Sequence, residues 1–347
     1  MGVLPFLFNK LYLGTDLVTE RVKSMYDNID FKLKIDTVSG IDFLRETPRY
    51  LDKITGEHNF ESGRVVSGIL GDINSNHFKV TVSSRGVNIK DGSLCKFHLG
   101  DNFKTLSRSE TQKAIEQLSD TLHLPIEKAC VSRIDIAQNF IVQNPAQVYY
   151  NHLGELKHST RQGIGNGNGT IETLYYYQSR GVLSFYDKIK EQKAKGQPIP
   201  ELYQERNVLR FEQRHKSRLA QTFNVECVTA QMLFNEAFYT QIIDLWKNNY
   251  FSIKKINDIT LNFEAMKNVT DLNNLGVLAL VEMQGGELNL ISQIKEAQQS
   301  GKLTKKQAFD LRNRITTACK VKDGITAQNE AILELDKKVK EAVKFYR

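Results

Sequence analysis

Three segments of the 347-residue chain alternate apolar and polar side chains with the period of a β-strand, and this alternation constrains the fold most. They cover residues 172–190, 131–139 and 207–216. The first predicts a hairpin that turns at Gln178–Gly181. On its returning strand, Leu183 and Phe185 point into a core, whereas Tyr186 and Lys188 lie on the opposite face. A phenol beside an amine on the open face of a sheet is unusual for packing alone.

The other two segments have the same design, because each buries aliphatic or aromatic residues and presents polar ones. Residues 131–139 present Arg133, Asp135 and Asn139, and residues 207–216 present Arg210, Glu212, Arg214 and Lys216. If the three strands share a sheet, a tyrosine, two carboxylates and several cations gather on one face. That set suits phosphoryl transfer from DNA. The carboxylates hold a hard divalent cation, the arginines neutralise phosphate, and the phenol attacks phosphorus.

The order of these motifs resembles a known family. VSRIDIAQNF, then YYQSR-GVLSFYDK, then VLRFEQRHKS is the motif order of rolling-circle replication initiators. It is similar to the Rep_trans plasmid type, with its R-hydrophobic-D, Y-x-G-S-R…R-x-Y-[DN]-K and R-hydrophobic-E motifs. It also resembles the filamentous-phage gene II/X type and the phage and plasmid replication proteins of Bacteroidetes. The resemblance covers about residues 30–220, and it departs from the plasmid pattern at Gln178, where that pattern has glycine.

The resemblance implies both a fold and a chemistry. In such initiators, which have a Rep nuclease-like fold, a tyrosine nicks one origin strand, stays on the 5′ phosphate and later religates it. Carried over by motif, Tyr186 is the nucleophile and Lys188 assists it, while Asp135 and Glu212 hold magnesium or manganese (Mg²⁺ or Mn²⁺). The flanking tyrosines at positions 175, 176 and 177 are rival phenols, but none of them precedes Asp-Lys.

Two further residues are candidate metal ligands. Asp36 ends the polar side of a strand predicted over residues 30–38, in which positions 31, 33 and 35 face inward. Capping of the following turn is the alternative for this aspartate. His98 lies on the polar face of a strand predicted over residues 93–99, beside one over 77–83. Nicking enzymes of the histidine-hydrophobic-histidine superfamily use two histidines, and this chain lacks such a pair, so a surface role for His98 stays open.

The charge of the chain favours a polyanionic partner, since the formal net charge is +7 and the pI is about 9.0. Many soluble proteins are mildly basic, so charge alone does not decide for nucleic acid. The cations that flank the predicted nucleophile are the candidate DNA contacts. They are Arg133, Arg180, Arg210, Arg214, Lys190 and Lys193. A solvated lysine-rich turn is the alternative for the last two.

The remaining pattern predicts an α+β fold, with an antiparallel sheet that has helices on one face, followed by a helical C-terminal region. Ser107 and Glu110 have the spacing of a capping box at the start of a helix over 107–122, and another helix follows Pro145. The glycine-rich residues 162–170 indicate a flexible loop. Helices are predicted at residues 229–248, 275–283, 288–299, 304–319 and 327–346. We expect a nicking and joining domain over residues 1–220 and a helical DNA-binding or oligomerisation domain over 221–347.

Cysteine usage and hydropathy bear on location and partners. The four cysteines form no C-x-x-C pair, and Cys95 and Cys130 are expected to be buried thiols in a reducing cytoplasm. The N-terminus lacks the pattern of a signal peptide, and no apolar run approaches the ~20 residues of a membrane span. We therefore expect a protein in the cytoplasm of a bacterial host, with no membrane contact. Its expected partner is origin DNA, single-stranded or in a hairpin, with a host helicase and a second copy of the chain as candidates.

Two other functions remain open from the sequence. A mobilisation relaxase would share the chemistry but act in transfer, and the missing histidine pair argues against it. A DNA-binding replication regulator without catalysis is the second alternative. The presence of Tyr186, Asp135 and Glu212 argues against a loss of catalysis. Arg133 with Asp135, and Glu212 with its neighbouring arginines, also have a purely structural interpretation as cross-strand ion pairs.

Overall fold

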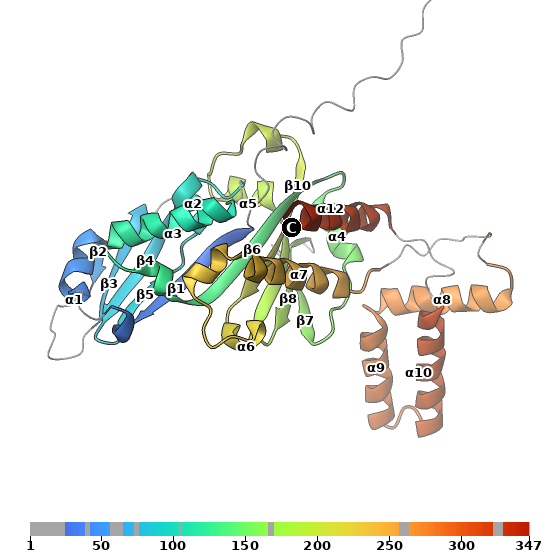
Figure 1. Ribbon diagram of the computed structural model, residues 1–347. Helices are drawn as coiled ribbons and strands as arrows, with labels where there is room; N and C mark the ends of the chain where they lie inside the picture. Colours follow the sequence, from blue (N-terminus) through green and yellow to red (C-terminus); the bar gives the residue numbers. More distant parts are fainter. Residues whose placement is uncertain are drawn as a thin grey trace, which may run out of the picture.

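The computed structural model describes residues 25–38, 42–55, 65–72, 76–103, 106–165, 170–256, 264, 266–321 and 329–346. Within these residues a 10-stranded sheet has the order β2-β3-β4-β5-β1-β6-β10-β9-β8-β7, and its neighbouring strands are antiparallel (Figure 1). Helices cross one broad face of this sheet, and a helical region follows it in the chain. The predicted α+β class is therefore confirmed.

The strands and helices have the following bounds. The strands are β1 (Tyr26–Lys34), β2 (Asp52–Thr55), β3 (Val66–Asp72), β4 (Asn76–Ser83), β5 (Gly86–Lys90), β6 (Cys130–Val142), β7 (Ser159–Gly165), β8 (Ile171–Gln178), β9 (Gly181–Asp187) and β10 (Asn207–His215). The helices are α1 (Phe43–Glu46), α2 (Leu94–Leu99), α3 (Arg108–Leu122), α4 (Ala146–His152), α5 (Lys188–Ala194), α6 (Leu219–Phe223), α7 (Glu236–Ser252), α8 (Val269–Met283), α9 (Glu287–Gln299), α10 (Lys305–Lys320) and α12 (Glu330–Tyr346).

The three segments that alternate in the sequence are neighbours at the middle of the sheet. β10 pairs with β6 on one side and with β9 on the other, and β8 and β9 form the predicted hairpin. The register sets Arg214 opposite Asp135 and Arg210 opposite Tyr186. Because directly opposed residues share a face, the polar side chains of all three strands lie on the same face. The prediction that they share one sheet is confirmed.

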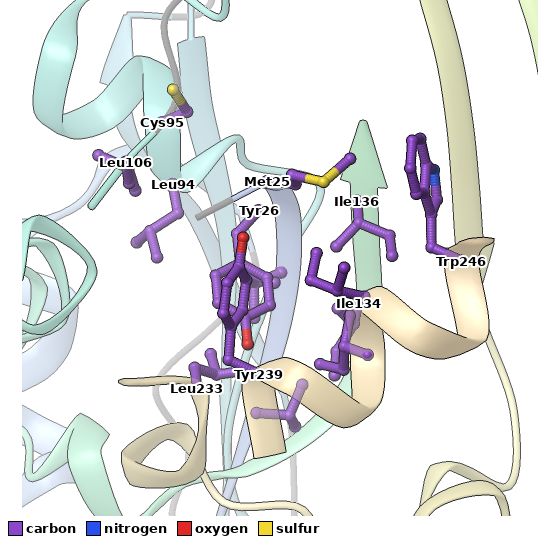
Figure 2. Packing of buried hydrophobic residues seen from close by; sticks show 14 of the residues in the cluster. Met25, Tyr26, Leu94, Cys95, Leu106, Ile134, Ile136, Leu233, Tyr239 and Trp246 are labelled. Carbon is purple, nitrogen blue, oxygen red and sulfur yellow. The ribbon is translucent and has the colours of Figure 1, made fainter. Parts of the chain in front are cut away.

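The other face of these strands forms the core. The rings of Phe185 and Phe211 stack with centroids 4.5 Å apart, and Phe211 in turn stacks on Trp246 of α7 at 4.9 Å. Figure 2 shows Trp246 and Tyr239 of α7 beside aliphatic residues of β6, with Tyr26 of β1 next to Tyr239. These buried rings hold the helices on this face and leave the opposite face of the sheet to the polar side chains.

The helices predicted after residue 220 are confirmed. The starts predicted at 229 and 275 are at 236 and 269 in the structure, the other bounds differ by a few residues or fewer, and positions 327 and 328 lie outside the described residues. Two of them, α7 and α12, contribute buried residues to the same core as the sheet. By contrast, α8, α9 and α10 pack on one another around two small apolar clusters and stand beside the sheet (Figure 1). The division expected at residue 220 stays a prediction. None of the helices in the described ranges is both long and apolar enough to cross a bilayer.

The strand predicted over residues 93–99 is wrong, because Leu94–Leu99 form α2. Ser93 accepts a hydrogen bond from the backbone N–H of Lys96 and so caps the start of the helix, and Gly100 ends it with φ +85°. The strand beside β4 is instead β5, whose first residue, Gly86, has φ +128°. A Cβ there would lie 2.0 Å from the carbonyl oxygen of Leu33, so this position requires glycine.

Three local predictions also need correction. Ile35 was expected to face inward, but the chain leaves β1 for a 3₁₀ turn and the side chain is 46% exposed. Of the glycine-rich residues 162–170, positions 162–165 belong to edge strand β7, whereas 166–169 lie outside the described residues. Cys95 is a buried thiol as expected, but Cys130 forms a disulfide with Cys227, with Cα atoms 6.1 Å apart.

The aromatic stack should contribute strongly to stability. We expect Phe211→Ala to lower the free energy of unfolding by roughly 3–5 kcal/mol, because it opens a cavity between Phe185 and Trp246. Phe309→Ala is the control, since Phe309 is 60% exposed on α10 and its truncation should change stability by less than about 0.5 kcal/mol. Urea unfolding followed by circular dichroism checks both values. Equal losses in the two variants would contradict the role of the stack.

Candidate active site

Two buried carboxylates, Asp135 on β6 and Glu212 on β10, share one guanidinium on the polar face of the sheet. They are only 0% and 3% exposed. Arg214 lies directly opposite Asp135, and its Nε is 2.5 Å from Glu212 Oε1 and 3.8 Å from Asp135 Oδ2. The arginine therefore holds both acids at one point on the sheet.

A second arginine fixes the orientation of Asp135. The Nε of Arg133 donates to Asp135 Oδ1 at 2.8 Å, and its Nη2 donates to Oδ2, which makes a two-pronged ion pair. Burial and the nearby Glu212 nevertheless raise the pKa of Asp135 to about 7 against the opposing effect of Arg133. This carboxyl therefore changes its charge near neutral pH.

Tyr186 reaches this pair of acids from β9. Its hydroxyl donates a hydrogen bond to Glu212 Oε2 at 3.1 Å. The register explains the contact, because Tyr186, Glu212 and Asp135 occupy diagonal positions on three adjacent strands, roughly 7–8 Å apart from one position to the next. Burial raises the pKa of Tyr186 well above its usual range, so the phenol is protonated at rest. The structure thus brings the predicted tyrosine and both predicted carboxylates together.

Lys188 does not lie on the open face of β9 as the alternation predicted. The strand ends at Asp187, whose side chain accepts hydrogen bonds from the backbone N–H groups of Ile189 and Lys190 and so caps α5. Lys188 opens that helix, is 1% exposed, and forms an ion pair with Glu191 at 2.7 Å. Burial, and then the charge of Arg210, lower its pKa to about 8 against the opposing effect of Glu191.

Arg210 is buried rather than presented to solvent. Its Nη2 is 2.5 Å from Asp27 Oδ2, and its Nη1 donates to Asn139 Oδ1 at 3.1 Å and to the carbonyl oxygen of Asn102 at 3.3 Å. Its Nε also lies 3.8 Å from Glu212 Oε2. Arg210 therefore supports Glu212 from within the protein, and its contacts are not those of a surface DNA clamp.

Asp27 is an acidic residue of the site that sequence reasoning missed. It is 6% exposed and also accepts a hydrogen bond from Ser93 Oγ at 2.6 Å. Burial alone would raise its pKa, but Arg210 and Ser93 bring the pKa below its ordinary value. The register of β1 shifts between Tyr26 and Ile29, and this irregularity interrupts the alternation that would have marked Asp27.

The structure does not bring Asp36 or His98 to the carboxylate pair. Asp36 lies in the 3₁₀ turn after β1, beyond the position at which Lys32 faces Cys130, the first residue of β6. His98 lies on α2, where its Nδ1 is 3.1 Å from Gln117 Oε1 on α3. No group of three histidine, cysteine or acidic side chains that could hold a metal occurs within the described ranges.

The predicted DNA-contacting cations differ in accessibility. The side chains of Arg133 and Arg214 are 19% and 27% exposed, so part of each guanidinium reaches the surface beside the acids. Arg180 is exposed at the turn of the β8–β9 hairpin, and Lys190 and Lys193 are exposed on α5. These cations lie on elements adjoining Tyr186, whereas Arg210 is withdrawn into the protein.

The site offers the oxygen ligands that a divalent cation prefers, but these oxygens already accept hydrogen bonds from arginine side chains. Asp135 and Glu212 are oxygen ligands of the kind that Mg²⁺ and Mn²⁺ prefer. Three of their oxygens accept hydrogen bonds from Arg133 or Arg214, and the fourth accepts one from Tyr186. A cation would therefore take the place of a guanidinium, most directly that of Arg214, which bridges the two acids.

The raised pKa of Asp135 predicts a pH dependence of stability. A carboxyl that binds its proton more tightly in the folded state stabilises the fold while it is protonated. This contribution is lost as the pH rises from the ordinary pKa of 3.8 to the folded-state pKa of about 7. The free energy of unfolding of the wild type, relative to Asp135→Asn, should fall by roughly 1–4 kcal/mol across this window. Urea titrations at pH 4.5 and pH 8 measure the difference. A constant difference between the two proteins would contradict the shift.

Comparison with known proteins places the chain in a family. No curated protein matches it. The family model described as "Replication-associated protein G2P N-terminal" matches residues 25–235, which include β1, β6, β9 and β10 with all of the acids and arginines of the site. Because this match spans more than half of the chain, the protein belongs to the family of replication-associated proteins defined by the G2P N-terminal region.

Proposed function

We propose that this protein initiates rolling-circle DNA replication by cleaving one origin strand with Tyr186 and rejoining it later. The observation that carries the proposal is the hydrogen bond of 3.1 Å from the Tyr186 hydroxyl to Glu212. A nucleophile within hydrogen-bond reach of a base, which is itself held by a third group, is the arrangement that covalent catalysis requires. Here the third group is Arg214, which binds Glu212 and faces Asp135.

The bond changes follow from this contact. Glu212 Oε2 takes the phenol proton while the Tyr186 oxygen attacks the phosphorus of the scissile phosphate. A tyrosine–phosphate bond forms and the bond from phosphorus to the 3′-oxygen breaks. That oxygen takes up a proton from water, and the resulting 3′-hydroxyl primes synthesis. Attack of a 3′-hydroxyl on the phosphotyrosine reverses the step and closes the strand.

The electrostatics of the site explain why Tyr186 would become a nucleophile only when DNA binds. Burial keeps the proton on Tyr186 in the free protein, and the nearby charge of Glu212 disfavours a phenolate further. The partly exposed guanidiniums of Arg133 and Arg214 are available to neutralise an arriving phosphate. Lys188 is buried near Arg210, and its ion pair with Glu191 holds it at the start of α5.

Asp135 and Glu212 are the residues that would hold Mg²⁺ or Mn²⁺, which when bound would polarise the phosphate. Release of Arg214 from the acids would then free its guanidinium for the DNA backbone. The membership in a replication-associated family favours initiation over mobilisation as the biological role. The partner that we propose is origin DNA, exposed as a single strand or hairpin loop. A host helicase and a second copy of the chain are further candidates.

The nucleophile can be tested by trapping the covalent intermediate. Wild type incubated with supercoiled DNA carrying the origin, or with single-stranded origin oligonucleotides, and Mn²⁺ should form a protein–DNA adduct that survives denaturing electrophoresis. Tyr186→Phe should form none, because it lacks the attacking oxygen. Tyr177→Phe is the matched control, since Tyr177 is an exposed tyrosine on the same hairpin and its variant should form the adduct normally. An adduct that persists in Tyr186→Phe would place the nucleophile elsewhere.

The role of Glu212 predicts a kinetic effect. Glu212→Gln should slow single-turnover cleavage about 100-fold or more, because the amide cannot take the phenol proton. The exposed Glu116→Gln on α3 should leave the rate unchanged. Rates are compared over a series of Mn²⁺ concentrations and with a chelator. Cleavage by Glu212→Gln at the wild-type rate would remove Glu212 from the reaction, and full activity in chelator would remove the metal.

A further inference from the structure

Two tyrosines of β8 form an aromatic platform on the polar face of the sheet. Tyr175 is half-buried and Tyr177 is 39% exposed, and their rings stack with centroids 5.5 Å apart and planes inclined by 22°. Tyr176 between them points to the other face, where it is fully buried and donates hydrogen bonds to the carbonyl oxygens of Leu153 and Gly154. The strand therefore uses one tyrosine for the core and turns two toward solvent.

The register places this platform next to the nucleophile. Tyr186 lies opposite Thr173, so Tyr175 occupies the diagonal position, roughly 7–8 Å away along the sheet. Tyr177 lies opposite Val182, which is itself opposite Arg214. Tyr175 is level with Glu212 across Ser184, so the two rings lie alongside the acids on the polar face, on the side of Tyr186 that is nearer the hairpin turn.

Packing does not account for the two rings. Neither hydroxyl makes a hydrogen bond with another group in the described part of the chain, and the positions opposite them on edge strand β7 are Gln162 and Thr160. Exposed aromatic rings on a sheet offer flat faces on which bases stack, and such stacking serves single-stranded DNA because the faces of paired bases are already covered. Arg180, exposed at the turn just beyond Tyr177, supplies a cation for the backbone.

We propose that Tyr175 and Tyr177 form a nucleobase-stacking site for unpaired DNA beside the scissile phosphate. This inference rests on the proposed function, because the DNA strand that stacks on the two rings is the strand that Tyr186 cleaves. Stacked bases would hold the strand extended over β8 and β9 and bring the phosphate next to them against Tyr186. The site would select unpaired over duplex DNA by the rings themselves, without reading a particular sequence.

Binding measurements on ring-deletion and ring-retaining variants test the site. The probe is a fluorescent mixed-sequence 30-nucleotide DNA in chelator, compared with a duplex of the same sequence. Tyr177→Ala should weaken single-strand binding about 10-fold, in line with the usual contribution of base stacking, whereas Tyr177→Phe should bind like wild type. Tyr50→Ala is the matched control, since Tyr50 is 37% exposed outside this face. Duplex affinity should change in none of them.

A second measurement uses the wild-type protein and does not depend on the folding of a variant. Single-stranded DNA that carries 5-iodouracil should crosslink under near-ultraviolet light to Tyr175 or Tyr177, identified by mass spectrometry. An oligonucleotide of the same length with abasic sites should bind about 10-fold more weakly. Wild-type affinity in Tyr177→Ala, or crosslinks confined to other residues, would overturn the stacking site.

The two proposals can fail separately. Absence of a covalent adduct in wild type, together with ring-dependent binding of single strands, would remove the nicking function and keep the stacking site. An adduct that forms equally well in Tyr177→Ala and Tyr175→Ala, with unchanged affinity, would keep the nicking function and remove the stacking site.

Discussion

The whole polar face depends on how the protein compensates two buried acids. Asp135 and Glu212 are both almost inaccessible to water, and an ionised carboxylate in such a place is stable only when cations adjoin it. Arg133, Arg214 and Arg210 supply that charge from β6 and β10 themselves. The guanidiniums are thus part of the structural framework of the site. A charged ligand that binds there must compete with the ion pairs that already exist.

Strand alternation was sufficient to predict the middle of the sheet, because β6, β9 and β10 keep a strict period of two over most of their lengths. It predicted which residues share a face and hence that Tyr186 lies near the two acids. The same rule fails where the backbone is irregular. Asp27 lies at a register shift, and Lys188 follows an aspartate that ends the strand by capping a helix.

Short segments were the other source of error, and the reason is local hydrogen bonding. Residues 93–99 alternate like a strand, but the Ser93 side chain accepts a hydrogen bond from a free N–H group of the first helical turn, and Gly100 ends the helix. The sequence pattern also could not predict which polar side chains of one face are buried. Arg210 and Arg214 lie four residues apart on the same face of β10, yet one is enclosed by Asp27 and Asn102 and the other reaches the surface.

The pairing of Arg210 with Asp27 has a consequence for how the domain can be divided. The arginine belongs to a central strand, whereas its counter-ion comes from β1, the first strand that the structure describes, 183 positions earlier in the sequence. A fragment that began after β1 would enclose a guanidinium without its partner, which typically costs roughly 3–5 kcal/mol. The polar face therefore cannot be separated as a unit of three strands, and a fragment that keeps the Arg210–Asp27 ion pair must start at or before Asp27.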